Sequence, residues 1–241
     1  MLPRSCRRVS GGWAHPDSSY NRLAVLLYYV TDGKAFAGNN AQTRAALLCR
    51  IGQAARAGVD YIQLREKELD APDLERLARE ALRIIRENSS QTSFLVNTHA
   101  DIALAVGADG VHLPAGSLPA SEMRARWLRQ ADREPLIGVS AHSVADARQA
   151  EIEGASFAVL APIFEKAGSG AEAMGLGALH QACATSRLPV LALGGVSLAN
   201  AGACLDAGAA GVAGIRLFQQ GDVGETVAKL RQLASGTTRR G

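Results

Sequence analysis

Aromatic residues and long apolar runs are both scarce in this sequence. Only 5% of its 241 residues are Phe, Trp or Tyr, whereas glycine occurs 25 times. Small residues favour close packing of helices on strands over a thick aromatic core. No apolar run approaches the ~20 residues of a membrane-spanning helix, and the N-terminal arginines precede no apolar signal segment. We therefore expect neither a membrane partner nor a secretory signal.

Paired cysteines are also missing. The four cysteines form no C-x-x-C motif, and their spacing is not that of zinc ligands. Unpaired cysteines are typical of a reducing compartment, so the sequence predicts a cytoplasmic protein. The cysteines are Cys6, Cys49, Cys183 and Cys204.

The net charge of +3 does not predict a basic binding face. Five arginines lie close to the two ends of the chain, and without them the remainder is slightly acidic. A nucleic-acid-binding domain carries its basic residues on a folded face, so we expect no nucleic-acid partner. The five residues are Arg4, Arg7, Arg8, Arg239 and Arg240.

Short apolar runs alternate with longer amphipathic stretches along most of the chain. The expected strands are Ala24–Val30, Asp60–Leu64, Ser93–Val96, Gly110–Leu113, Leu136–Val139, Phe157–Leu160, Val190–Leu193 and Gly211–Gly214. The expected helices are Thr43–Ala57, Asp70–Glu87, Ala100–Val106, Ala120–Arg129, Val144–Glu153, Leu176–Thr185, Leu198–Ala207 and Val223–Leu233.

Eight such units predict an α/β protein with a single (β/α)8 TIM barrel over residues 24–235. An open, doubly wound sheet is the alternative. Residues 1–23 are expected to form a disordered extension, and residues 236–241 a flexible tail. A helix end followed by glycine precedes every second strand, at Gly58, Gly107, Gly154 and Gly208. We interpret these glycines as helix stops at the face of the barrel away from the catalytic loops.

The segment after the second strand carries three polar side chains at alternating positions. A strand end would point Gln63, Arg65 and Lys67 the same way. Two cations in a barrel mouth are costly unless they meet an anion, and a phosphate or diphosphate meets that need. The alternative is local ion pairing with Glu66, Glu68 and Asp70.

A second phosphate-binding signal follows the last two strands. Gly194 and Gly195 precede a helix, so backbone N–H groups can approach an anion there. Gly214 and Ile215 offer similar amides after the eighth strand. The loops after strands seven and eight are the usual phosphate site in this fold.

Other polar residues follow strands three to five. Asn97 and Ser140 supply hydrogen-bonding groups, and His142 is a proton carrier that titrates near neutrality. His112 lies within the fourth strand, where a structural role in the core is favoured over a functional one.

Taken in order, several motifs resemble the family of thiamine-phosphate synthase and its relative, the thiazole tautomerase. The similarity runs from about Leu27 to Gln219. The motifs cover residues 27–32, 63–67, 96–97, 107–113, 138–143, 162–164 and 194–196.

The resemblance implies a transferase that joins an aminopyrimidine methyl diphosphate to a thiazole ethyl phosphate, with Mg²⁺ assisting the release of diphosphate. It implies that the pyrimidine diphosphate is held by Gln63, Arg65, Lys67 and Asn97. It implies that the thiazole phosphate is held by Gly194, Gly195 and the amides of Ile215 and Arg216. His142, Ser140 and Lys67 are the expected catalytic residues.

The sequence departs from the family pattern where the metal is expected. Thr98 and Ser117 stand at the two positions where the synthase pattern has Asp, and Mg²⁺ prefers charged oxygen ligands. Lys166 is a shifted substitute for a lysine that the pattern has after Pro-Ile-Phe, and Arg216 replaces a small residue.

Three functions follow from this pattern. The first is a synthase. The second is a thiazole tautomerase in which His142 moves a proton without a metal. The third is a non-catalytic barrel that binds a phosphate ester. All three imply small phosphorylated ligands, and formation of a homo-oligomer stays open.

Overall fold

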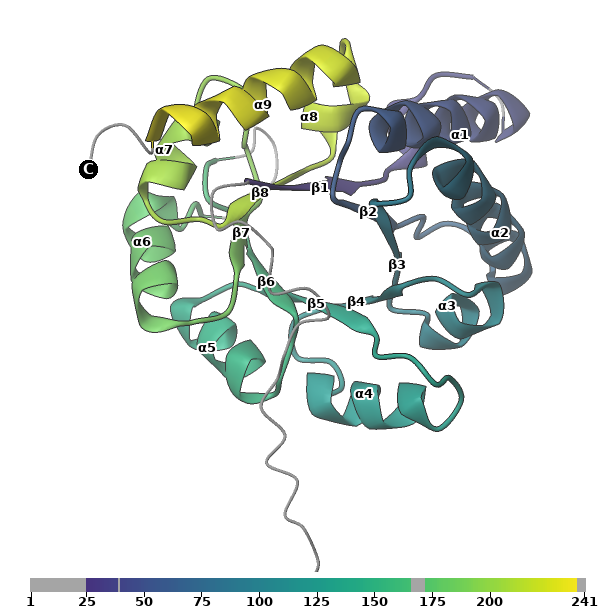
Figure 1. Ribbon diagram of the computed structural model, residues 1–241, viewed down its shortest axis with the longest axis horizontal. Coiled ribbons are helices and arrows are strands. Elements are labelled where there is room, and N and C mark those ends of the chain that lie inside the picture. The colour runs from purple at the N-terminus through teal and green to yellow at the C-terminus, as the bar shows by residue number, and fades with distance from the viewer. Residues whose placement is uncertain (1–24, 39, 166–171, 238–241) are drawn as a thin grey trace, which may run out of the picture.

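The computed structural model describes residues 25–38, 40–165 and 172–237 and contains a closed, eight-stranded parallel barrel surrounded by helices (Figure 1). Strands pair in chain order, and Leu26 beside Gly211 closes the ring. The predicted TIM barrel is confirmed, and the alternative of an open sheet is wrong. The strands are β1 (Leu26–Val30), β2 (Tyr61–Leu64), β3 (Ser93–Asn97), β4 (Gly110–Leu113), β5 (Leu136–Ala141), β6 (Phe157–Leu160), β7 (Val190–Ala192) and β8 (Gly211–Gly214).

Each predicted helix is present on the outside of the barrel (Figure 1). The helices are α1 (Asn40–Arg56), α2 (Ala71–Asn88), α3 (Ala100–Val106), α4 (Ala120–Leu128), α5 (Val144–Ile152), α6 (Gly175–Thr185), α7 (Ala201–Asp206), α8 (Arg216–Gln219) and α9 (Val223–Thr237), with a short 3-10 helix, η1 (Gly33–Ala35). The sequence did not predict η1 or α8, which are too short to show periodicity. The predicted N-terminal extension lies outside the described residues, and α9 continues two residues past the predicted end of the barrel.

Helix α2 shows how local sequence sets an element. The Asp70 side chain accepts a hydrogen bond from the Asp73 amide at 2.9 Å and so caps the helix, and Pro72 follows in the first turn. One apolar face is buried, namely Leu74, Leu77, Ala78, Ala81 and Ile85. In contrast, α7 begins three residues later than predicted, because Asn200 closes a turn by accepting from the Ser197 amide at 2.8 Å.

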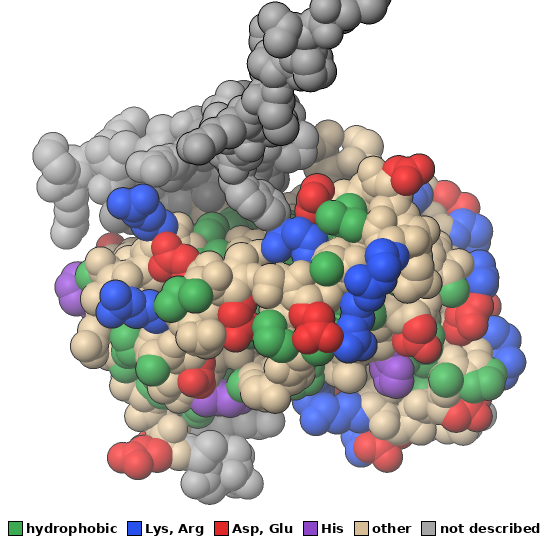
Figure 2. Space-filling model, turned by 90° about the horizontal axis from the view of Figure 1, so that it is seen from below, with side chains coloured by type: hydrophobic (Ala, Val, Ile, Leu, Met, Phe, Trp, Pro, Cys, Tyr) green, Lys and Arg blue, Asp and Glu red, His purple; other side chains and the backbone are tan. Residues whose placement is uncertain are grey.

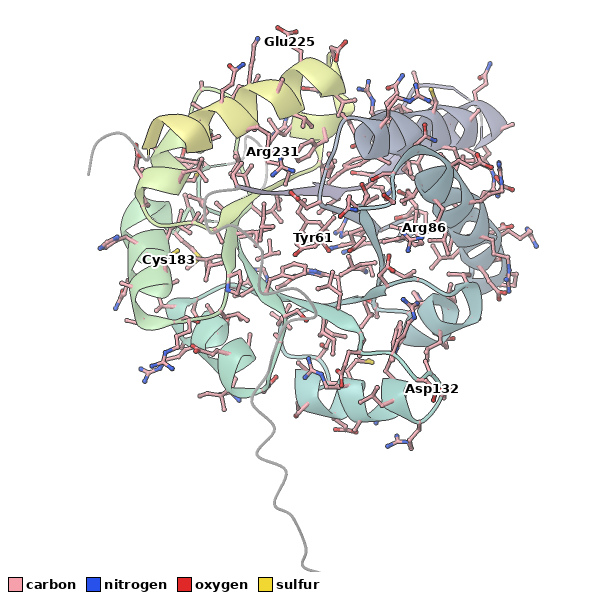
Figure 3. All side chains as sticks on the ribbon, viewed as in Figure 1. Tyr61, Arg86, Asp132, Cys183, Glu225 and Arg231 are labelled. Carbon is pink, nitrogen blue, oxygen red and sulfur yellow. The ribbon has the colours of Figure 1, made fainter. Side chains whose placement is uncertain are left out.

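The barrel lumen is filled by side chains. Alternate residues of the strands point inward and form a cluster around Tyr28, Leu95, Phe157 and Leu191. The ring of Tyr61 projects into this lumen (Figure 3) and stacks on Phe157 with centroids 5.0 Å apart. A second, larger core lies between the strands and the helices. The lumen is therefore a packed core and not an open pore.

The four predicted helix stops are confirmed. Gly58, Gly107, Gly154 and Gly208 have positive φ angles of 86°, 77°, 77° and 98°, a conformation that glycine adopts without steric cost. Each reverses the chain between an outer helix and the next strand at the N-terminal face of the barrel.

A repeated side-chain contact joins the strands at this N-terminal face. Asp60, just before β2, accepts the Leu27 amide of β1 at 2.7 Å. Asp109, before β4, accepts the Phe94 amide of β3 at 2.7 Å, and Ser156, before β6, accepts the Ile137 amide of β5 at 2.9 Å. The corresponding residue before β8 is Ala210, whose side chain cannot accept a hydrogen bond.

Replacing Asp109 by alanine should lower the free energy of unfolding by about 1–3 kcal/mol, because the Phe94 amide loses its acceptor. The guanidinium of Arg86, which reaches both Asp109 oxygens at 2.7 Å from α2 (Figure 3), also loses its partner. Urea denaturation measures the change. The control is Glu122→Ala, which breaks an exposed helical pair with Arg126 and should cost about 0.5 kcal/mol or less. Equal losses would show that the Asp109 contact is not structural.

On the face shown in Figure 2, acidic and basic side chains are interspersed rather than separated by sign. Among the helices described by the structure, none combines the length and the apolar character that crossing a bilayer requires.

Candidate functional site

The predicted site residues gather at one end of the barrel. Arg65 follows β2, Asn97 ends β3, His142 follows β5, Gly194 follows β7 and Ile215 follows β8. Because all eight strands are parallel, the segments that follow them meet at the same rim. The rim that carries Arg65 is therefore also the rim that carries the glycine pair.

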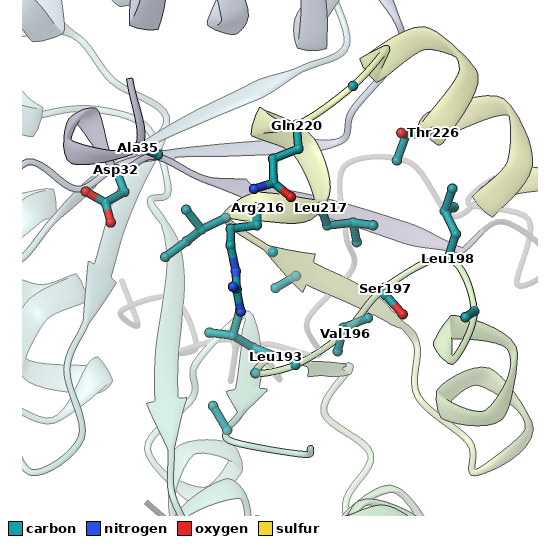
Figure 4. Close-up of a pocket in the computed structure, with 18 of the residues that line it drawn as sticks. Asp32, Ala35, Leu193, Val196, Ser197, Leu198, Arg216, Leu217, Gln220 and Thr226 are labelled. Atoms are coloured by element: carbon teal, nitrogen blue, oxygen red, sulfur yellow. The ribbon is translucent and has the colours of Figure 1, made fainter. Parts of the chain in front are cut away.

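A cavity of about 1050 Å³ opens at this rim (Figure 4). Five of the predicted residues line it: His142, Gly194, Gly195, Ile215 and Arg216. The sequence did not assign a role to Asp32, Lys34, Gln220 or Lys229, which also line the cavity. Asp32 could have been suspected, because it lies just after a strand in a motif shared with the family.

The backbone and the packing of Gly194 and Gly195 both require glycine. Gly194 and Gly195 have φ angles of 91° and 66°. A Cβ atom on Gly194 would lie 2.7 Å from Pro162, and one on Gly195 would lie 2.7 Å from the Cβ of Phe164. Both carbonyls are engaged, since Gly194 O accepts from the Phe164 amide at 3.0 Å and Gly195 O accepts from Asn200 at 2.9 Å.

The amide N–H groups of this pair have no acceptor among the described residues, and the same holds for the amides of Ile215 and Arg216. Four amides that need a partner thus line one cavity. An anion with several oxygen atoms, such as a phosphate, matches this arrangement.

Arg216 adds a positive charge to the cavity. Its side chain extends from α8 toward Leu193, across the centre of the close-up in Figure 4. The residue is exposed, and no carboxylate of the described part of the chain pairs with it. Its guanidinium is therefore available to a bound anion.

The carboxylates near Arg65 and Lys67 are engaged elsewhere. Glu66 accepts from the Thr31 hydroxyl at 2.6 Å and from the Gly33 amide at 2.8 Å, and burial raises its pKa. Glu68 pairs with Lys34 at 2.8 Å, and Asp70 caps α2. Within residues 25–38, 40–165 and 172–237, neither Arg65 nor Lys67 forms an ion pair within 4.0 Å. The charge of Arg65 still lowers the pKa of Glu66 against the larger effect of burial, and that of Lys67 lowers the pKa of Glu68 beside the larger effect of Lys34, so local neutralisation stays an alternative.

The predicted alternation of Gln63, Arg65 and Lys67 holds only in part. Strand β2 ends at Leu64. Lys67 lies beyond it in a turn and is exposed, whereas Gln63 is only 2% exposed. The three side chains therefore differ in burial, because the two-residue period of a strand stops where the strand stops.

A backbone contact orients the ring of His142. Its Nδ1 lies 2.8 Å from the carbonyl oxygen of Ala161. A carbonyl oxygen only accepts, so Nδ1 carries a hydrogen and Nε2 is the ring nitrogen that remains for a ligand. The ring is exposed and lines the cavity. His142 is thus positioned to accept a proton from a ligand.

His112 lies in the core, and both of its ring nitrogens are engaged. It is 4% exposed, and its two ring nitrogens lie 3.1 Å from the Tyr28 hydroxyl and 2.9 Å from Ser140 Oγ. Burial, with a smaller effect of Arg65, lowers its pKa to about 3. Burial likewise raises the pKa of Tyr28. The ring of His112 is therefore neutral at physiological pH.

This low pKa makes stability depend on pH. Below about pH 6.5 the unfolded chain binds a proton at His112, whereas the folded protein does not until about pH 3. The free energy of unfolding should therefore fall on acidification through this range, by up to about 1.4 kcal/mol per pH unit, and His112 should contribute no slope above pH 6.5. Urea denaturation at several pH values measures the slope.

The control for this pH dependence is His112→Gln, which cannot titrate. Its unfolding free energy should fall less steeply than that of the wild type between about pH 6.5 and pH 4.5. The two proteins share all other titrating groups, so parallel slopes would mean that His112 becomes charged in the folded state.

The expected metal positions carry hydroxyl groups. Thr98 and Ser117 are both exposed. Thr98 has a φ of 66°, which a β-branched residue rarely adopts, and its hydroxyl accepts from Asn97 Nδ2 at 2.9 Å. Across the described residues, no three His, Cys, Asp or Glu side chains cluster so as to hold a metal. Lys166, the other substituted position, lies outside the described residues.

Comparison with known proteins agrees with this geometry. A family model described as thiamine monophosphate synthase matches residues 27–218. A thiamine-phosphate synthase of Methanoculleus marisnigri is 40% identical over 211 residues, which cover 85% of this chain and 93% of the relative. That of Moorella thermoacetica is 37% identical over 185 residues, which cover 76% and 85% of the two chains.

A solved structure is also similar along most of its length. Thiamine phosphate pyrophosphorylase from Pyrococcus furiosus superposes with a TM-score of 0.73 at 26% identity, covering 89% of this chain and 98% of that one.

Proposed function

Since the chain belongs to the thiamine monophosphate synthase family, we propose that it is a transferase that joins an aminopyrimidine methyl diphosphate to a thiazole ethyl phosphate. The observation that supports the proposal is that amides without an acceptor among the described residues, after β7 and β8, lie at the same barrel rim as the cationic segment after β2, although that segment does not itself line the cavity. Two anionic groups on two substrates would satisfy these two sets of donors.

The thiazole phosphate would lie against the glycine pair. The amides of Gly194, Gly195, Ile215 and Arg216 would donate to its oxygens. The Arg216 guanidinium would offset its charge. Since both glycine carbonyls are tied back into the fold, these donors are fixed before the ligand arrives, which lowers the entropic cost of binding.

The pyrimidine diphosphate would meet Arg65 and Lys67. In the proposed reaction the bond between the pyrimidine methylene carbon and the diphosphate oxygen breaks, and its electron pair leaves with diphosphate. The thiazole nitrogen then donates its lone pair to the resulting cation and forms the new C–N bond. The charge that develops on the leaving group is where fixed cations lower the barrier most. Asn97 would orient the pyrimidine, whereas Gln63 is buried and its amide nitrogen donates to Tyr28, so only its amide oxygen could contribute.

The residues at the rim do not fit a magnesium ion held by the protein. Mg²⁺ is bound through one or two carboxylates together with substrate phosphates, and the two expected positions offer the neutral hydroxyls of Thr98 and Ser117. The proposed steps therefore rely on the protein's own cations. A Mg²⁺ requirement stays a prediction. Comparing the release of diphosphate with and without the ion tests it.

A second activity is favoured by one observation. Nε2 of His142 has no hydrogen-bond partner among the described residues, and the residue lines the cavity that contains the glycine pair. A thiazole tautomerase needs a single base that moves one proton on the thiazole carboxylate phosphate, and His142 has that position.

The test is incubation of the full chain with both precursors, in the presence and absence of Mg²⁺, with release of diphosphate as the readout. A synthase releases diphosphate only when both precursors are present. No release at high protein concentration would remove this function. In that case, proton exchange on the thiazole carboxylate phosphate would support the tautomerase, provided that His142→Ala abolishes the exchange. Thermal stabilisation by either precursor without turnover would support a binding protein.

A further inference from the structure

Four polar side chains form a line of hydrogen bonds across the barrel lumen. Gln63 Nε2 lies 2.6 Å from the Tyr28 hydroxyl, and this hydroxyl lies 3.1 Å from His112 Nδ1. His112 Nε2 lies 2.9 Å from Ser140 Oγ. Three of these residues are buried, at 2% exposed for Gln63, 0% for Tyr28 and 4% for His112. Only Ser140, near the end of β5, is partly exposed.

The direction of every bond in this line follows from its first member. An amide nitrogen only donates, so Tyr28 accepts from Gln63 and turns its single hydrogen toward His112. His112 Nδ1 must then accept. Because the ring is neutral, its one hydrogen is on Nε2 and is donated to Ser140.

At the end of the line, Ser140 has one hydrogen that nothing in the described part of the chain accepts. If the bonds ran in the opposite direction, Ser140 would donate its hydrogen to His112 Nε2. Its hydroxyl could then only accept a hydrogen bond from a ligand. The direction of these hydrogen bonds therefore sets whether Ser140 can offer a ligand a donor or only an acceptor.

We propose that Tyr28 and His112 are positioning residues that fix Ser140 as a hydrogen-bond donor toward an unprotonated ring nitrogen of the bound pyrimidine. The identity of the pyrimidine rests on the proposed function, whereas the direction of the line does not. A donor at this point favours a ring nitrogen with a lone pair and disfavours a pyrimidine whose nitrogen at that position carries a hydrogen.

The packing around His112 supports a fixed ring. Phe157 packs edge-on against Tyr28 with centroids 5.2 Å apart, and the His112 ring lies 5.8 Å from Tyr28 and 6.3 Å from Phe157. A Cβ atom on Gly138 would lie 2.7 Å from His112 Nδ1 and 2.5 Å from Phe157 Cζ. Glycine at this point of β5 thus leaves the space that the imidazole occupies, and the ring cannot turn without moving its neighbours.

The first test is nitrogen NMR of the free protein with ¹⁵N-labelled histidine, which requires no substrate. Loss of one of the five histidine spin systems in His112→Gln assigns His112. We expect Nε2 protonated and Nδ1 unprotonated, unchanged between about pH 6 and pH 8. A hydrogen on Nδ1, or a charged ring, would overturn the proposal.

The second test uses Tyr28→Phe, which keeps the aromatic packing and removes the hydroxyl. His112 should then populate both tautomers, and calorimetry should show aminopyrimidine methyl diphosphate binding about tenfold more weakly. Affinity for inorganic diphosphate should not change, because the anion site is untouched. The matched control is Tyr29→Phe, on the neighbouring tyrosine that packs outside the lumen against Phe218 and should change neither readout.

Equal binding of the pyrimidine by wild type and Tyr28→Phe would overturn the positioning role. Absence of pyrimidine binding by the wild type, together with a protonated Nε2, would instead contradict the proposed function while leaving the direction of the line intact. The two failures are thus distinguishable.

Discussion

Replacing Arg65 by alanine should lower kcat/KM for diphosphate release by about two to three orders of magnitude. The charge would be lost from the point where the leaving group becomes more negative. The backbone at this position should stay in place, because the Arg65 amide donates to the Thr31 hydroxyl at 2.9 Å and Thr31 in turn donates to the partly buried Glu66 at 2.6 Å. Steady-state kinetics with both precursors measures the loss.

The control for this substitution is Arg79→Ala on α2. It changes the net charge by the same amount and breaks only an exposed helical pair with Glu75, so kcat/KM should be unaffected. Arg65→Lys should recover part of the activity, since the charge returns without the planar fork that binds two oxygens. Similar kinetics for Arg65→Ala and wild type would mean that Arg65 does not contact the diphosphate.

Replacing Gly195 by alanine should weaken binding of the thiazole phosphate by about a hundredfold and lower the free energy of unfolding by about 1–3 kcal/mol. The residue has a φ of 66°, and its new Cβ would lie 2.7 Å from the Cβ of Phe164 and 3.1 Å from two carbonyl oxygens. To relieve this contact the loop must shift, and the cradle amides shift with it. Calorimetry with thiazole ethyl phosphate and urea denaturation measure the two effects.

Gly177→Ala is the matched control for Gly195→Ala. Gly177 is an exposed residue of α6, and a Cβ atom there would have no neighbour within 4 Å. This variant should gain about 0.5–1 kcal/mol of stability from the better helix propensity of alanine, with unchanged affinity for the phosphate ester. If Gly195→Ala binds the thiazole phosphate as tightly as Gly177→Ala, the glycine pair is not the cradle.

The barrel could be predicted from the sequence because its pattern is local. Each helix end with its glycine, and each apolar strand, is visible within about ten residues, as α2 with its Asp70 cap shows. Eight repeats of that pattern then fix the topology, since parallel strands joined by helices close in chain order. The glycine pair after β7 was predictable for the same reason.

The polar line in the lumen could not be predicted. β1 reads LLYYV, and nothing local shows whether Tyr28 or Tyr29 faces inward. Pairing with both β2 and β8 sets this orientation, and these partners lie more than thirty residues away. The sequence likewise does not show that Asp32 and Lys229 line the same cavity, because the two residues are nearly two hundred positions apart and only the fold brings them together. The expected direction of Lys67 was wrong because the alternation was extended past Leu64, the residue at which β2 was predicted to end and does end.

The side-chain contacts at the N-terminal face hold some strands and not others. Side chains of Asp60, Asp109 and Ser156 each fasten the preceding strand, whereas Ala210 leaves β7 without such a fastening. The β7–β8 ladder is also short, with two paired positions against four between β2 and β3. Local opening at β7 must therefore break fewer bonds. At the N-terminal face, the amide hydrogens of β7 should therefore exchange with solvent faster than those of β1 and β3, while the glycine pair at the opposite rim keeps its own hydrogen bonds.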